Sequence, residues 1–168
     1  MSAPATTDEL FQYLAELGVR TTTARHAPVF TVEEAKALRG DLPGGHVKNL
    51  FLRNKRGEMW LVVAEEDRAI DLKKLGERLG AGRLSFGSAE RLMASLGVPP
   101  GAVTPFAVIN DRDHRVRVVI DRGLLAHDPL NCHPLTNAMT TAISPKDLLA
   151  FLAACGHRPE VIDLGELR

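Results

Sequence analysis

A lysine and an asparagine stand where a flexible segment of the chain passes into a stiff one. Gly44-Gly45 gives the backbone freedom, and the run from Val47 to Leu52 has the apolar residues of a β-strand. Lys48 and Asn49 fall at the start of that strand. A lysine ammonium group there can bind a phosphate or stabilise a polarised carbonyl group. Taken alone, these residues fit better with a solvated lysine on an edge strand, which discourages aggregation.

A loop rich in glycine and proline could supply the second part of a site. Three prolines and the glycines at 97 and 101 exclude a regular helix or strand over residues 98–105. Such a loop can present backbone N–H groups to a carbonyl oxygen, as an oxyanion hole does. The loop residues considered for this role are Gly101, Ala102, Val103, Thr104 and Pro105. Taken singly, each of them is explained as an ordinary turn residue.

His133 could supply the third part. It lies in the segment 128–134, which prolines at 129 and 134 stiffen into a predicted loop. A histidine beside a substrate can bind an amine or hydroxyl group, or move a proton. We therefore predict one small cleft formed by Lys48 and Asn49, the 101–105 loop and His133, with the ammonium group facing backbone amides. The alternative for His133 is a surface histidine with no part in chemistry.

Metal binding is a weaker interpretation of the same segment. His127, Asp128, Cys132 and His133 lie within seven residues, but their spacing matches no familiar zinc pattern. Loop residues near prolines account for these side chains equally well. The sequence therefore predicts no metal ion at this place.

Cysteine catalysis is another alternative. Cys132 directly precedes His133, and neighbours on an extended segment point in opposite directions. An activating base would then have to come from elsewhere, such as His127 or His114. A small buried thiol is the preferred interpretation for Cys132, and also for Cys155.

The composition is that of an ordinary globular chain without a strong electrostatic preference. Its 168 residues suit a single domain spanning 1–168, with 45% hydrophobic and 25% charged residues. Lys plus Arg and Asp plus Glu both number 21, so net charge gives no global attraction to nucleic acid. No apolar run approaches the roughly 20 residues that span a bilayer, and no signal peptide is recognisable. With two cysteines, we expect a cytoplasmic protein without a membrane partner.

Sequence fingerprints of nucleotide binding and of serine hydrolases are missing. The chain has no G-x-x-x-x-G-K-[ST] phosphate loop, no G-x-G-x-x-G after a strand and no G-x-S-x-G elbow. We therefore expect no cofactor, and a site built from loops and strand ends rather than from a familiar motif.

Capping residues and hydrophobic spacing predict an α+β fold. Helices are expected over 6–18, 31–38, 71–79, 88–97 and 144–156, and strands over 20–26, 47–53, 59–64, 84–86, 107–109, 116–120, 136–143 and 161–164. Two hairpins are predicted, with turns at 54–57 and 110–113. Hairpins mixed with short helices indicate one curved, mixed, mostly antiparallel and barrel-like sheet surrounded by helices.

Several stretches resemble the YbaK/ProX-type aminoacyl-tRNA deacylases. The run His46-Val47-Lys48-Asn49-Leu50-Phe51-Leu52 is similar to that family's lysine strand, and Gly101 to Phe106 is similar to its Gly-x-x-x-Pro loop. The stretches 110–116 and 127–136 resemble the free-standing branch called ProXp-ala or PrdX, which clears alanine from tRNA for proline. The resemblance extends from about Phe30 to about Leu164.

The resemblance implies hydrolysis of the ester that joins a wrong amino acid to the 3′ end of tRNA(Pro), with alanine as the expected amino acid. It implies neither a metal nor a covalent nucleophile, since the family relies on the terminal ribose hydroxyl. By carry-over, Lys48 and Asn49 hold the terminal nucleotide and orient the ester, the 101–105 loop surrounds the carbonyl, and His133 lies near the aminoacyl group. Cys132 departs from the family's usual residue. The alternatives are removal of cysteine, serine or threonine, a non-catalytic module that binds tRNA or a synthetase, and a regulatory ligand-binding domain.

Size selection would separate alanine from proline, because a tight pocket excludes the larger side chain by steric clash. We expect Val29, Phe30 and Val103 among the wall residues, since they are apolar and close to the expected site. The expected partners are the acceptor end of aminoacyl-tRNA and prolyl-tRNA synthetase. Basic residues on the two predicted hairpin turns either contact the acceptor stem or are simply solvated; they are Arg53, Lys55, Arg56, Arg112 and Arg115.

Overall fold

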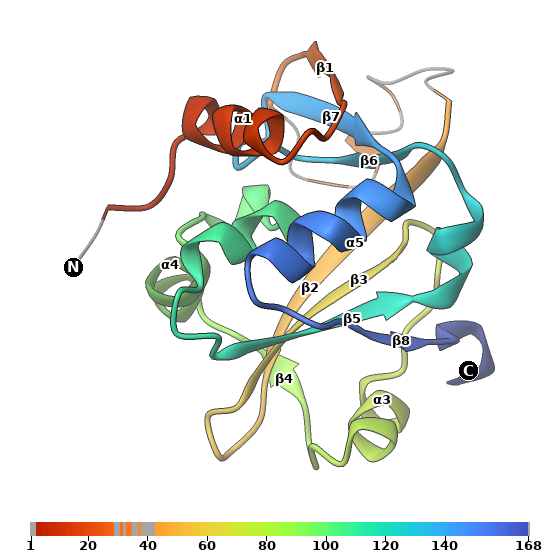
Figure 1. The fold of residues 1–168 in the computed structure, drawn as a ribbon. Helices are drawn as coiled ribbons and strands as arrows, with labels where there is room; N and C mark the ends of the chain where they lie inside the picture. Colours follow the sequence, from red (N-terminus) through yellow and green to blue (C-terminus); the bar gives the residue numbers. More distant parts are fainter. Residues whose placement is uncertain (1–2, 29–30, 32, 35–36, 38–42, 168) are drawn as a thin grey trace.

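One eight-stranded sheet forms the centre of the molecule (Figure 1). The computed structural model describes residues 3–28, 31, 33–34, 37 and 43–167. Neighbouring strands follow the order β1-β7-β6-β2-β3-β5-β8, and β4 pairs with β2. Four strand pairs are antiparallel and three are parallel, so the expected mixed, mostly antiparallel sheet of the α+β class is confirmed. The strands are β1 (Thr22–Arg25), β2 (Gly45–Arg53), β3 (Met59–Glu65), β4 (Ser85–Phe86), β5 (Val116–Asp121), β6 (Leu130–Cys132), β7 (Met139–Ile143) and β8 (Glu160–Ile162).

The described helices begin at the capping residues that the sequence predicts. They are α1 (Thr7–Glu16), α3 (Leu72–Leu79), α4 (Ala89–Leu96) and α5 (Pro145–Ala154). The side chains of Thr6, Asp71, Ser88 and Ser144 each accept a hydrogen bond from a backbone N–H group of the first turn. The helix predicted over 31–38 lies largely outside the described residues. No helix in the described part of the chain is long and apolar enough to cross a membrane.

The first predicted hairpin is confirmed. β2 and β3 pair antiparallel from Val47↔Glu65 to Arg53↔Met59. Asn54 closes the turn, because its side chain bonds both the backbone N–H and the carboxylate of Glu58. β3 also pairs with β5, and hydrophobic clusters cover both of its faces, which explains its continuously apolar sequence.

The second predicted hairpin is wrong. Residues 107–109 belong to the 3₁₀ helix Pro105–Asn110, and β5 pairs parallel with β3 and β8 instead. The proline at the first helical position and the Thr104 hydroxyl, which accepts from Phe106 N–H, start this helix. A run of three apolar residues looks the same in a buried helix and in a buried strand, so spacing could not separate them. The segment expected as a loop at 128–134 contains β6, and the 3₁₀ helix Arg122–Ala126 precedes it.

Two hydrophobic clusters lie on opposite faces of β2, β3 and β5. Alternate residues along β3 divide between them, because successive side chains of a strand point to opposite faces. We call the larger one the inner core; it includes Leu61, Val63 and residues of α1, α4 and α5. The outer core includes Val62, Ala64 and residues of α3. Figure 1 shows α4 and α5 on one side of these strands and α3 on the other.

Gly44 and Gly45 allow β2 to approach the segment that precedes β6. Gly44 has a φ of +103°, and a Cβ atom on it would lie 2.3 Å from the carbonyl oxygen of Pro129. A Cβ atom on Gly45 would lie 2.7 Å from Cβ of His127. The Gly45 N–H donates to the Pro129 carbonyl over 2.8 Å. The two glycines therefore serve close packing of the backbone at the start of β2.

A Gly44→Ala substitution is expected to lower the free energy of unfolding by about 3 kcal/mol, because it adds a backbone clash to an unfavourable φ. Gly80→Ala is the control: its φ is +65°, but nothing lies within 4 Å of its added Cβ atom. This control should cost only about 1 kcal/mol. Urea unfolding of the three proteins measures both values, and equal losses would contradict the close approach.

Candidate functional site

The sheet splits along one edge of β2. On that edge β6 pairs with Gly45 and His46, and β4 pairs with Leu52 and Arg53. Among the described strands, residues 47–51 pair only with β3, on the opposite edge. The five residues from 46 to 50 are each partly exposed, whereas the strand becomes buried from Phe51. Lys48 and Asn49 therefore lie on a partly exposed stretch of β2 that pairs with a described strand on one edge alone.

The register places Lys48 and His133 on the two sides of this split. β2 and β6 run parallel, and His46↔Asn131 is their last pair. Lys48 lies two residues after His46, and His133 lies two residues after Asn131. Because the two strands are parallel, both segments continue from this last pair in the same direction. They therefore flank the gap that opens between β2 and β6, which we call the β2–β6 gap. Two of the three segments expected at the site meet here.

The pleat of β2 directs Lys48 and Asn49 to opposite faces. Val47 and Phe51 contact the inner core, so Asn49, which alternates with them, shares that face. Leu50 and Leu52 contact the outer core, which puts Lys48 on the other face. The Lys48 ammonium group donates a hydrogen bond to the backbone carbonyl of Arg68. Asn49 Oδ1 is buried and has no hydrogen-bond partner among the described residues, and such an acceptor suits a donor from a ligand.

The 101–105 loop packs on the inner-core face. Ala102, Thr104 and Pro105 are buried, while Gly101 and Val103 are partly exposed. Val103 contacts the inner core, as Val47 does. The loop thus shares a face of β2 with Asn49, whereas the Lys48 ammonium reaches the opposite side. Ala102 N–H already donates to the Pro99 carbonyl over 2.9 Å, which removes it as an oxyanion donor.

His133 is held as a neutral imidazole by a hydrogen bond at Nδ1. Its Nδ1 lies 2.9 Å from the Met139 carbonyl oxygen, so Nδ1 carries the proton and Nε2 keeps a lone pair. Burial lowers the pKa of His133, although the bond to Met139 opposes the shift. Nε2 can therefore accept a hydrogen bond from an amine or a water molecule at neutral pH. The ring of His26 lies beside that of His133, with their centroids 6.3 Å apart. The two histidines are far apart in the sequence, so no spacing of residues predicts this contact.

The structure also shows the surroundings of the residues considered for cysteine catalysis and for metal binding. Cys132 is buried, as preferred, and burial raises the pKa of its thiol to about 12. Such a thiol is protonated at neutral pH and is a poor nucleophile. Within the described ranges, no group of three or more His, Cys, Asp or Glu side chains is placed to hold a metal ion. His127 instead bonds to Glu65 over 2.9 Å. Val29 and Phe30 lie outside the described residues, so their expected place in the wall stays a prediction.

An ion-pair network that the sequence analysis missed lies next to Lys48. Arg68 contacts Glu65 and the fully buried Asp121, and Glu65 contacts His127. A cleft of about 550 Å³ opens beside them, between the start of β2 and the turn after β3. Its lining consists of residues 44–46, 65–69 and His127. Only long-range pairing brings these segments together, so spacing along the chain carried no signal for them.

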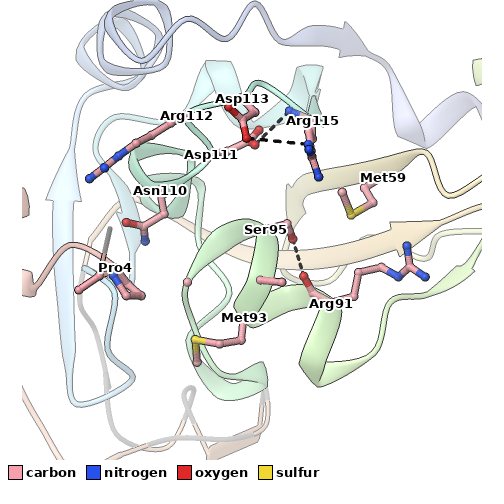
Figure 2. A pocket seen from close by; sticks show the side chains of 13 residues that line it. Pro4, Met59, Arg91, Met93, Ser95, Asn110, Asp111, Arg112, Asp113 and Arg115 are labelled. Atoms are coloured by element: carbon pink, nitrogen blue, oxygen red, sulfur yellow. Dashed lines mark hydrogen bonds and ion pairs between the residues drawn. The ribbon is translucent and has the colours of Figure 1, made fainter. Parts of the chain in front are cut away.

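The basic residues expected on the second hairpin turn line another cavity. Arg112 and Arg115 lie there with Arg91 of α4, around a space of about 710 Å³ (Figure 2). Figure 2 shows the three side chains on different parts of the rim rather than converging on one point. The Nε atom of Arg115 lies 4.0 Å from an Asp113 carboxylate oxygen, which offsets part of the positive charge. Contact of these arginines with an RNA stem stays a prediction.

Comparison with known proteins identifies the family of this chain and agrees with its fold. Residues 26–151 match the family model of the aminoacyl-tRNA editing domain. The prolyl-tRNA editing protein ProX of Acetoanaerobium sticklandii is 40% identical over 152 residues, which cover 90% of this chain and 93% of the relative. The prolyl-tRNA synthetase associated domain-containing protein 1 of Danio rerio is 40% identical over 156 residues, covering 92% of this chain and 85% of that protein.

A solved structure described as a candidate trans-editing enzyme for prolyl-tRNA synthetase has the same fold. It is 21% identical, has a TM-score of 0.70, and the match covers 95% of this chain and 98% of that one. At this identity the likeness concerns the arrangement of helices and strands alone.

The raised pKa of Cys132 gives a direct chemical test. At pH 8 only about one Cys132 side chain in 10,000 would be a thiolate, given a pKa of about 12, so labelling by a thiol reagent should be very slow. The Cys132→Ala protein should show the same slow native labelling, now from Cys155 alone, whose pKa burial raises to about 11. In denaturant the wild type should release two equivalents and the variant one. Rapid native labelling that Cys132→Ala removes would show a reactive thiol.

Proposed function

The chain belongs to the aminoacyl-tRNA editing domain family, and we propose that it hydrolyses the ester of mischarged tRNA(Pro), with alanine as the amino acid removed. The observation that carries this proposal is the family match over 26–151, a range that contains every proposed site residue. The relatives named for prolyl-tRNA editing and for association with prolyl-tRNA synthetase support tRNA(Pro) and that synthetase as partners. We place the reaction in the cytoplasm, in keeping with two free cysteines.

The chemistry proposed for the site is direct attack of water on the ester carbonyl. Attack forms a bond from the water oxygen to the carbonyl carbon, the ester bond breaks, and the terminal ribose oxygen leaves with a proton. The protein has to hold the ester and the water in a reactive geometry, which alone can contribute much of the rate. No covalent enzyme intermediate and no metal ion enter this scheme.

Each proposed side chain has a role that fits its bonding state. The Lys48 ammonium has three hydrogens, so its bond to the Arg68 carbonyl leaves two for a phosphate of the terminal nucleotide. Asn49 Oδ1, buried without a partner, accepts from a ribose hydroxyl. His133 Nε2 accepts from the α-amino group or orients the water. The 101–105 loop borders the amino acid on the inner-core face.

The first test replaces Lys48. A Lys48→Ala protein is expected to hydrolyse Ala-tRNA(Pro) about 100-fold more slowly than the wild type, because one charged donor to the bound nucleotide is lost. Lys73→Ala, at an exposed position of α3, is the matched control and should keep the wild-type rate. Loss of label from radiolabelled substrate gives the rates, and circular dichroism checks the fold.

The outcomes separate the competing functions. Equal hydrolysis by Lys48→Ala and wild type would exclude the proposed site. A wild-type protein that binds tRNA but cleaves none of its alanyl, cysteinyl, seryl and threonyl esters would be a binding module. Faster cleavage of one of the last three esters would replace alanine as the assigned substrate.

The second test concerns the wall that excludes proline. Val103→Ala is expected to let the protein cleave Pro-tRNA(Pro) at least about tenfold faster than the wild type, since removing two methyl groups enlarges a pocket that discriminates by bulk. Val161→Ala is the control, because Val161 is also partly exposed but lies on β8, away from the loop. Sparing of Pro-tRNA(Pro) by Val103→Ala would remove Val103 from the wall.

A further inference from the structure

The turn after β3 determines where the Lys48 ammonium group lies. Lys48 pairs with Ala64 near the end of β3, and its side chain reaches on to the carbonyl oxygen of Arg68. The Arg68 N–H in turn donates to the Glu65 carbonyl over 2.9 Å, which closes the turn. A lysine side chain has a flexible four-carbon stem, so an ammonium group at an accessible site needs a fixed acceptor to stay in one place.

The side chain of Arg68 is anchored from two strands. Its Nε lies 3.0 Å from Asp121 Oδ2 at the end of β5, and its terminal nitrogen lies 2.6 Å from Glu65 Oε2. The bond to Asp121 is the main reason why the pKa of Arg68 is raised. The Asp121 side chain is fully buried and Arg68 is 15% exposed, so water screens this pair weakly.

The same two carboxylates make further hydrogen bonds, Asp121 with backbone N–H groups and Glu65 with a histidine side chain. Asp121 Oδ2 accepts from Glu65 N–H over 3.2 Å, and Asp121 Oδ1 accepts from Gly123 N–H over 3.4 Å. The second oxygen of Glu65 lies 2.9 Å from Nε2 of His127, which precedes β6. One network therefore connects β3, β5 and the lead-in to β6. These elements lead to both sides of the β2–β6 gap.

We propose that Arg68 is a positioning residue for Lys48. Its ion pairs to Asp121 and Glu65 hold the 65–69 turn, the turn presents the Arg68 carbonyl, and that carbonyl holds the ammonium group at the gap. This inference rests on the proposed function, since it assigns a role in the same hydrolysis. A purely structural cross-link would have the same contacts but would affect activity only through folding.

The test pairs two arginine variants. Arg68→Met keeps an apolar stem and removes both ion pairs. Arg117→Met is the matched control, because Arg117 also pairs with a glutamate, Glu58, over 3.1 Å, but near the start of β3. Single-turnover hydrolysis of Ala-tRNA(Pro) by Arg68→Met is expected to be about 10- to 100-fold slower than by the wild type, because a misplaced catalytic group lowers the rate. The enzyme concentration at half-saturation should stay within about threefold of the wild-type value, since binding is largely kept. Arg117→Met should match the wild type.

A double-mutant cycle separates positioning from stability. In a Lys48→Ala background, Arg68→Met should change the remaining rate by less than about twofold, because the group that it positions is gone. An equal fold-loss in both backgrounds would overturn the proposal, and so would a wild-type rate for Arg68→Met. If Arg68→Met does not fold, Glu65→Gln takes its place. This change neutralises one of the two carboxylates that contact Arg68, on a side chain that is 29% exposed and also contacts His127. It should show a smaller loss of rate, and again little further loss in the Lys48→Ala background.

A readout without substrate completes the test. Nitrogen-15 relaxation of the lysine ammonium groups should show one restricted group, which Lys48→Ala removes and Arg68→Met makes as mobile as surface lysines. Unchanged restriction in Arg68→Met would overturn the proposal. The two proposals also fail differently: a slow Lys48→Ala with a fully active Arg68→Met ends only the positioning role. A fully active Lys48→Ala ends the proposed site and the positioning role together.

Discussion

The change of partners along β2 is the constraint on which the rest of the structure depends. β2 pairs with β6 over two residues, and from Val47 to Arg53 it pairs with β3. Hydrogen bonds to β6 cannot continue beyond His46↔Asn131 because the two strands diverge there, and the backbone on that edge becomes accessible. The close approach at Gly44 and Gly45 sets the point from which they diverge. Because β2 stops pairing with β6 at this point, the proposed site lies along a strand in the middle of the sheet rather than at its outer edge.

The pleat then distributes functional groups to two faces. Lys48 and Asn49 are neighbours in sequence, yet one shares a face with the outer core and the other with the inner core. The two faces have different surroundings. On one face a backbone carbonyl group and ion pairs lie around Lys48. On the other face the Asn49 oxygen is buried and has no hydrogen-bond partner among the described residues. A substrate that contacts both residues therefore has to reach both faces of β2 at this place.

Burial decides the protonation states around the gap. Desolvation keeps the Cys132 thiol protonated and lowers the pKa of His133, so the first cannot attack and the second is ready to accept. The pKa of Arg68 moves in the opposite direction, since the hydrogen bond to buried Asp121 raises it. The site therefore combines a neutral acceptor with a fixed cation, an arrangement that suits an anionic nucleotide carrying a polar ester.

The sequence by itself determined the local elements. Four helix starts could be predicted from the capping residues Thr6, Asp71, Ser88 and Ser144. The continuously apolar run of β3 indicated a strand buried on both faces, and both faces are covered by hydrophobic clusters. It also singled out Lys48, Asn49 and His133, in part through family resemblance. Tertiary structure alone decided that Pro105–Asn110 is a helix, that β5 runs parallel to β3, and that Arg68, Asp121 and His127 gather beside Lys48. The reason is physical: capping bonds and side-chain alternation act within a few residues, whereas strand register and ion pairs join segments that only the folded chain brings together.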